Sequence, residues 1–458
     1  MSYSPLLLNI RRAVVLALVA APAAGWAQQA AVVTLEDARA RVRDESWSIQ
    51  ISEEQIAQTE LLMDSARAVL LPNVSAGAAF TFNDIEVELA FPNPLQPIVP
   101  YLTEVRDQLN PELTDPSVFG AAAEPQVIQP RTQLTGNVVV SQTVYNARAF
   151  PLLRQARTSI ETAAMGLEQT AFQLERSVID LYFAVVGLRR FLEISEQNVE
   201  VAGIALARAE SALEVGVGNR FDVTRAQVEL ATAERSLVAS QTGYQVALAQ
   251  LGLLLNMDGP FDIAEPEELP ADAIAMSAEV ATFRPEVLAT DLQIELGEHR
   301  IREQEVLWIP TFAIQALANI QPKTAFNPNL VRWNVALTAD WQIYDAGLRR
   351  TERRRREYDV VMASLQRDQL IDQLETEIDT TRLRLEEAQT NVENAEAAVR
   401  LSQENLELLT EAQALGAVPA VDVILAQQQL FAAELALADS QVRVQQQVYT
   451  LRLLAAGR

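Results

Sequence analysis

The sequence predicts a mostly α-helical protein in which duplicated long helical hairpins are combined with four membrane-spanning β-strands. The first observation is a helical pattern that is interrupted and restarted twice, by VGVGNRFDV at 215–223 and by LGAVPAVDV at 415–423. The two interruptions lie 200 positions apart, since Asp222 corresponds to Asp422. The second observation is a set of short segments in which apolar and polar residues alternate. Such alternation is typical of strands rather than helices.

The helices after both interruptions carry small and apolar residues in steps of four and three, which is the seam of a coiled coil. Before the first interruption the chain has no proline from 152 to 213, so one helix of about 100 Å is expected at about 1.5 Å per residue. We therefore predict two repeats, 28–265 and 266–458, with hairpin tips near 215–222 and 415–422. The first seam is Ala226, Leu230, Ala233, Leu237, Ser240, Tyr244, Ala247 and Leu251, and six of these eight residue types recur 200 positions later.

The alternating segments are long enough to cross a bilayer, which takes about 9–11 residues per strand. In the last segment Trp333, Val335, Leu337 and Trp341 share one face, which we expect to contact lipid. Four strands leave unpaired edges, which lipid does not tolerate. Twelve strands from three chains would close a barrel, and the coiled helices would continue it as a tube. The strands are predicted at about 71–90 and 131–146 in the first repeat and about 308–321 and 331–345 in the second.

Two kinds of segment lie outside these elements. Arg11 and Arg12 precede an apolar run at 13–21, and small residues precede Gln28, so a signal peptide is predicted at 1–27. The segment 91–130 is rich in proline, which cannot continue a ladder of strand hydrogen bonds, and it is predicted to be a long external loop. A second proline-rich stretch at 256–274 is expected to link the repeats.

Composition excludes several functions. The net charge of −25 argues against nucleic acid as a partner, because binding phosphates needs clustered basic residues. A basic run at 349–356 is interpreted as a solvated or membrane-proximal helix start. The chain has no cysteine, and its one histidine, His299, is expected to be a solvated surface residue. Neither a catalytic group, nor a metal site, nor a cofactor motif is found, so the protein is not expected to be an enzyme.

Beyond these patterns, the chain resembles the TolC-type outer-membrane efflux proteins, also called outer membrane factors, from about Leu35 to Leu454. The resemblance rests on RPEVLATDLQIELGEHRIREQEVLWIPTF at 284–312, on the turns VYNARA and IYDAGL, and on the paired tips. It implies a homotrimer with a 12-stranded barrel in the outer membrane of a Gram-negative bacterium and an α-helical barrel in the periplasm. The implied function is passive transport as the exit duct of a tripartite efflux pump or a type I secretion system.

The resemblance also implies partners, namely a periplasmic adaptor protein, an inner-membrane pump and outer-membrane lipid. The adaptor's own hairpin would meet the tips, where Gly216, Gly218 and Gly416 are expected to form the turns. A soluble periplasmic or surface coiled-coil scaffold is the alternative. Membrane fractionation would distinguish the two.

The gate is expected at the same tips. Asp222 and Asp422 match aspartates of the pore mouth in this family, whereas Val418 stands where its best-known member carries a gate arginine. We hypothesise that Arg220 replaces this arginine by pairing with Asp422 of a neighbouring tip. Alternatively, Asp222 and Asp422 are helix N-caps, a position that favours aspartate.

Overall fold

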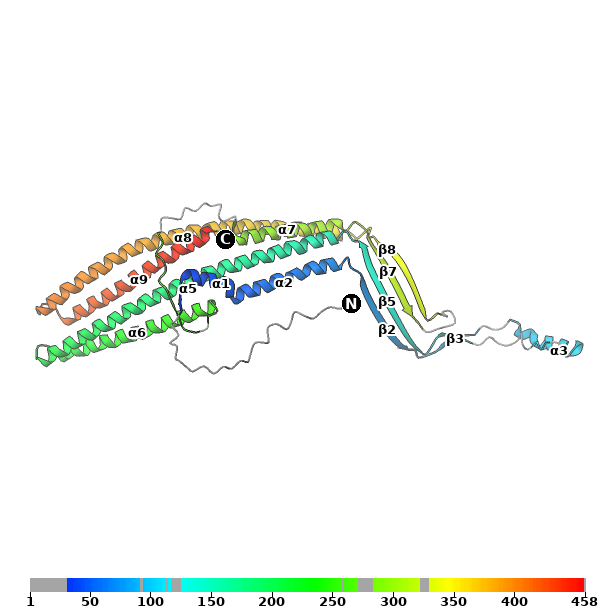
Figure 1. The fold of residues 1–458 in the computed structure, drawn as a ribbon, viewed down its shortest axis with the longest axis horizontal. Coiled ribbons are helices and arrows are strands. Elements are labelled where there is room, and N and C mark those ends of the chain that lie inside the picture. Colours follow the sequence, from blue (N-terminus) through cyan, green and yellow to red (C-terminus); the bar gives the residue numbers. More distant parts are fainter. Residues whose placement is uncertain are drawn as a thin grey trace, which may run out of the picture.

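The computed structural model describes residues 31–90, 94–112, 114–116, 125–257, 259–270, 283–321 and 329–456. The signal peptide predicted at 1–27 lies outside the described residues, and so do parts of the proline-rich segments 91–130 and 256–274. The molecule is elongated, with long helices over most of its length and a sheet toward one end (Figure 1).

Two long helical hairpins form the body of the protein (Figure 1). The first helix of each hairpin has 66 or 67 residues and is therefore about 100 Å long. The predicted seam is buried, since Ala226, Ala233 and Ala426 are at most 4% exposed. The helix α5 packs against α6 and α9, and α8 packs against α9, which confirms the duplicated helical hairpins. The bounds are α5 Ala149–Glu214, α6 Arg220–Leu254, α8 Leu348–Ala414 and α9 Ala420–Ala456.

A four-stranded antiparallel sheet contains strands from both repeats. Its order is β2-β5-β7-β8, so β2 and β8 are its edges. Opposite residues include Val74 and Val140, Val140 and Ala316, and Ala316 and Val335. Two of the predicted strands differ from those in the structure. The strand predicted at 71–90 is interrupted after Phe82, and the strand predicted at 331–345 ends at Asp340. The strands are β2 Asn73–Phe82, β5 Thr132–Tyr145, β7 Thr311–Ile320 and β8 Val331–Asp340.

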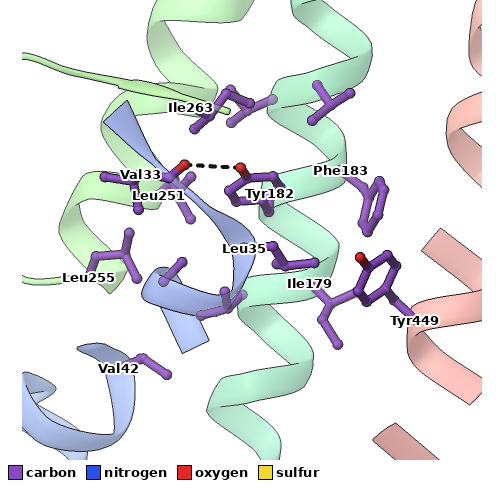
Figure 2. Packing of buried hydrophobic residues seen from close by; sticks show 14 of the residues in the cluster. Val33, Leu35, Val42, Ile179, Tyr182, Phe183, Leu251, Leu255, Ile263 and Tyr449 are labelled. Carbon is purple, nitrogen blue, oxygen red and sulfur yellow. Dashed lines mark hydrogen bonds between the residues drawn. The ribbon is translucent and has the colours of Figure 1, made fainter. Parts of the chain in front are cut away.

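The main apolar core lies where the segment that begins at Ala31 and the linker between the repeats pack against the hairpins. Strand β1 (Ala31–Val33) pairs in parallel with β6 (Phe261–Ile263). The fully buried Tyr182 of α5 holds this pair, since its hydroxyl lies 3.0 Å from the Val33 carbonyl and 2.7 Å from the Ala264 carbonyl. Figure 2 shows Tyr182 among Leu35, Ile179 and Leu251. Its burial raises the pKa of the Tyr182 hydroxyl.

Three further helices complete the helical body. Helix α1 (Leu35–Glu45) opens with a capping box in which Thr34 Oγ1 accepts from the Asp37 N–H at 3.1 Å. Helices α2 (Trp47–Ala68) and α7 (Pro285–Val306) run beside α5 toward the sheet. Four helices, α2, α5, α7 and α8, therefore lie side by side near the sheet, and α6, α5, α9 and α8 do so near the tips.

The predicted loop 91–130 contains regular structure. A 3₁₀ turn, η1 (Gln96–Ile98), leads into the helix α3 (Val99–Leu109), and β3 (Val87–Leu89) pairs with β4 (Gln126–Gln129). Prolines indicated a loop because they cannot donate to a ladder. Here Pro97 and Pro100 occupy first-turn positions, where a helix needs no N–H donor.

One other expectation was wrong. His299 is not solvated: it is 6% exposed, and its Nε2 lies 3.3 Å from Glu295 Oε1 on the same helix. Its burial follows from the packing of α7 against α5 and α8. Among the described helices, Ala420–Ala455 alone is long and apolar enough by composition to cross a membrane. This segment is helix α9, which packs along α8.

Candidate functional site

The two hairpin tips lie at the end of the molecule opposite the sheet (Figure 1). Helix α5 ends in a turn in which the Val217 N–H donates to the Ala212 carbonyl at 3.0 Å, and Gly216 has φ of 80°. Helix α8 ends in the same way, with a 2.9 Å bond from Ala417 and φ of 72° at Gly416. A left-handed residue after a helix is normally glycine, because a Cβ is strained there. Both glycines are therefore required by the turn itself.

Gly218 is needed for a different reason. Its N–H donates to the Ala212 carbonyl at 2.8 Å, and a Cβ on Gly218 would lie 2.9 Å from the Ala212 carbonyl carbon. That distance is too short for any side chain beyond glycine without a shift of the backbone. The second tip carries Val418 at the corresponding position, so this close approach belongs to the first tip alone.

The start of α6 is capped by Asn219, which the sequence analysis did not identify. Asn219 has extended backbone angles, and its Oδ1 accepts from the Asp222 N–H at 2.9 Å. The N-cap interpretation of Asp222 is therefore wrong, because Asp222 is the third residue of the helix. Asp422 is likewise the third residue of α9, and its N–H donates to the Pro419 carbonyl at 3.1 Å. The spacing Asn-x-x-Asp was the available signal for this cap.

Within one chain the structure does not bring Arg220 and Asp422 together. Arg220 is exposed and Asp422 is partly exposed, and over the described ranges neither forms an ion pair in the single chain. The second helices of the two hairpins, α6 and α9, are joined further along, where Gln428 Nε2 donates to Glu229 Oε2 at 2.8 Å.

Apolar side chains at the tips point into solvent. Val217 is 83% exposed and Leu415 is 86% exposed. Phe221 is also exposed, and the Arg225 guanidinium lies 5.6 Å from the centre of its ring. The sequence predicts the glycines of these turns but not the exposure of the apolar residues beside them, since a turn pattern says nothing about what its side chains contact.

The sheet has one apolar and one polar face. Trp333, Val335 and Leu337 of β8 are 61–77% exposed and share a face with the residues opposite them on β7. The apolar face continues across β2 as Val74, Ala76, Ala78, Phe80 and Phe82. The other face carries Asn73, Ser75, Asn137, Ser141, Gln315, Asn319, Asn334 and Thr338. No described element covers the apolar face.

Trp341 lies one residue beyond β8, at the junction between the sheet and the helices. Its Nε1 donates to the Trp308 carbonyl at 3.1 Å. The guanidinium of the buried Arg349 stacks 4.0 Å from the centre of the Trp308 ring. Two half-exposed tryptophans thus stand at the helical end of the sheet and Trp333 stands toward the other end, as expected for the two interfaces of a membrane.

Within the described ranges, the acidic and histidine side chains form no group that could hold a metal ion. The family model described as outer membrane efflux protein matches residues 41–257 and 278–457, which is most of the chain. The chain belongs to the outer membrane efflux protein family.

Similar proteins agree with this membership. The outer membrane efflux protein BepC of Brucella suis is 25% identical over 298 residues, and the match covers 64% of each chain. The toluene efflux pump outer membrane protein TtgC of Pseudomonas putida is 23% identical over 180 residues, with 37% of this chain and 36% of TtgC covered. The matches therefore span less than two thirds of the length of these curated relatives.

Solved structures share the fold. An outer membrane channel of Campylobacter jejuni, CmeC, has a TM-score of 0.69 at 12% identity, covering 92% of this chain and 85% of its own. A membrane protein of Pseudomonas aeruginosa has a TM-score of 0.70 at 16% identity, covering 96% and 99%. The family and its fold place the protein in the outer membrane of a Gram-negative bacterium. This location leaves the soluble-scaffold alternative without support.

Proposed function

We propose that three copies of this efflux-family protein form one continuous duct, with a 12-stranded β-barrel in the outer membrane and an α-helical barrel in the periplasm. The observation that carries the proposal is the open four-stranded sheet with an uncovered apolar face. In lipid an unpaired strand edge costs several kcal/mol for each unsatisfied backbone group. The free edges of β2 and β8 must therefore be paired.

The strand directions permit pairing between copies. Because the strands alternate in direction along the order β2-β5-β7-β8, β8 of one copy is antiparallel to β2 of the next. Two copies would give a barrel of about eight strands, which is so narrow that side chains fill its interior. Three copies are the smallest assembly of this sheet that leaves an open lumen. Its wall would be lined by the polar face, with Asn334 and Thr338 toward the lumen and Leu337 toward lipid.

The periplasmic helices would continue the lumen. Each chain contributes four helices at each level, so three chains supply a ring of twelve. Mass measurement on the detergent-extracted protein tests the assembly. A trimer is expected, and a monomer or dimer extracted from intact outer membranes would refute the closed barrel.

The duct would serve as the passive exit of a tripartite efflux pump or a type I secretion system. The named functions of BepC and TtgC as efflux proteins support this role. A periplasmic adaptor protein and an inner-membrane pump would be its partners. The tips would be the docking site, with Gly216, Gly218 and Gly416 shaping the turns and Val217 and Leu415 offering exposed apolar surface.

The gate would lie at the same end. Because the Asn219 side chain caps α6, the Asp222 carboxylate is free to face the pore mouth. Asp422, in the first turn of α9, would face the pore mouth from the second tip. Arg220 of one copy would pair with Asp422 of its neighbour and hold the mouth closed. The three Asp422 carboxylates, one from each copy around the three-fold axis, would also make the open pore prefer cations.

A further inference from the structure

The segment between β3 and β4 carries a feature that channel function does not explain. Helix α3 lies beyond the sheet, at the end opposite the hairpin tips (Figure 1). Apolar residues recur along η1 and α3 in steps of three and four. They are Leu95, Ile98, Leu102, Val105 and Leu109.

Leu102, Val105 and Leu109 take the a, d and a positions of a heptad on α3, and Leu95 and Ile98 extend this seam at the same spacing through the preceding η1 turn. A heptad seam is the pattern of a helix that packs against other helices. The seam is not buried in the single chain: Ile98 is 46% exposed, Leu102 is 39% exposed and Leu109 is 78% exposed. Only Val105, near the middle, is shielded to an intermediate degree.

We propose that the three α3 helices of the trimer associate through this seam into a short bundle over the external mouth of the duct. This inference rests on the proposed trimer. Because the three copies are related by a single three-fold axis, each of their β2–β5 connections would present one α3 on the same side of the membrane. The α3 seam of each copy would pack against the α3 seams of the other two copies.

The charges of the segment fit self-association. Positions flanking the seam are Val99, Tyr101, Arg106 and Gln108, so no two acidic residues would face each other across the bundle. Glu104 and Asp107 lie on the outer surface of the helix instead. Arg106 is held by Asp107 at 2.5 Å and by Asp115 at 3.4 Å.

The same charges disfavour an anionic membrane surface as the partner. Residues 86–131 contain seven acidic and two basic side chains, so the segment has a net charge of −5. An amphipathic helix that binds anionic lipid normally carries basic residues on its polar face. The polar face of α3 carries acids.

An 11-residue helix is marginal alone, because isolated helices shorter than about 12–15 residues are barely stable in water. Attachment to a common barrel changes this. Short tethers raise the effective concentration of one helix around another to the order of millimolar. The bundle would thus form only on the assembled trimer, where it would narrow the external mouth.

The chain contains no cysteine, so single cysteines test the bundle directly. Leu102→Cys would be introduced into the full-length protein, and outer membranes would be treated with a mild oxidant. Three cysteines in one layer can form one disulfide, so about two-thirds of the chains should run as covalent dimers on a non-reducing gel. A disulfide needs Cα atoms about 4.4–6.8 Å apart, which seam positions satisfy and outer positions do not.

Glu104→Cys, on the outer surface of the same helix, is the matched control and should stay monomeric. Leu109→Cys probes another layer of the seam if Leu102→Cys fails to assemble. A protein that is trimeric by mass but shows equal crosslinking at Leu102 and Glu104, or none, would overturn the bundle alone. It would mean that α3 meets lipid or another protein. A protein that is not trimeric would overturn the bundle and the proposed duct together.

Discussion

Arg349 and Asp345 form a buried ion pair at the point where the membrane sheet passes into the helical body, with Nε 2.7 Å from Oδ2. Asp345 also accepts from the backbone N–H groups of Arg349 and Gly347, and Arg349 donates to the carbonyls of Leu307 and Gln342. One side-chain pair thus fixes the junction between β8 and the start of α8. It also gives the basic run at 349–356 a structural role at its first residue.

We expect this pair to make stability depend on pH. The bonds from the Arg349 N–H and its guanidinium lower the pKa of the Asp345 carboxyl. A carboxyl with a lowered native pKa stabilises the fold above its unfolded pKa of about 3.9, and that contribution is lost as pH falls. In Asp345→Asn the melting temperature should be reduced at pH 7, and the difference from wild type should shrink toward pH 3. Asp64→Asn, in an exposed ion pair on α2, serves as the control. A difference independent of pH would show that the charge of Asp345 is unimportant.

A charge on the apolar face of the sheet should impair membrane assembly. Leu337 is 71% exposed on the face shared with Trp333, while its neighbour Thr338 lies on the polar face. Arginine near the middle of a bilayer costs about 2–4 kcal/mol on a lipid-facing strand. Leu337→Arg should therefore reduce the assembled fraction in outer membranes, and Thr338→Arg should not. Equal assembly of the two variants would mean that the lipid-facing side is wrongly assigned.

Docking at the tips is better tested at Val217 than at Gly218. Gly218→Trp would distort the turn, because even a Cβ at that position meets the backbone of Ala212. The Val217 side chain is 83% exposed and has room for a larger group. Val217→Glu should abolish export, with trimers of normal mass, by placing a charge on the docking surface.

Val217→Ile keeps the apolar character of this position and should retain export. Export by Val217→Glu at the wild-type rate would argue that the adaptor does not contact this tip. Loss of export in both variants would point to a defect in the turn rather than in docking.

The gate hypothesis makes two electrical predictions. Arg220→Ala should raise single-channel conductance, because it removes an exposed pair of at most about 1 kcal/mol from each of three copies. Asp422→Asn should reduce the preference for cations. Arg208→Ala removes an exposed arginine from α5 away from the turn and should leave the current unchanged. Wild-type currents in both Arg220→Ala and Asp422→Asn would assign these residues to the helix ends alone.

Local periodicity in the sequence determines most of the fold. The steps of three and four around Ala226 and Ala426 identify paired helices, and the alternation around Val335 identifies a two-faced strand. Both signals come from residues close in sequence, whose side chains recur on one face of a regular element. The 200-residue offset then fixed the duplication, because both repeats carry the same pattern.

Contacts between distant residues decided the rest. The bonds of Tyr182 to Val33 and Ala264, the burial of His299 and the order β2-β5-β7-β8 each join segments far apart in the chain. Sequence periodicity shows which face of a helix or strand is apolar, but it does not show which other segment packs against that face. At the first tip, Asn219 rather than Asp222 caps α6. Glycine is required at 218 because a Cβ there would lie 2.9 Å from the Ala212 carbonyl carbon. These depend on where the chain turns back on itself, which only the packed structure settles.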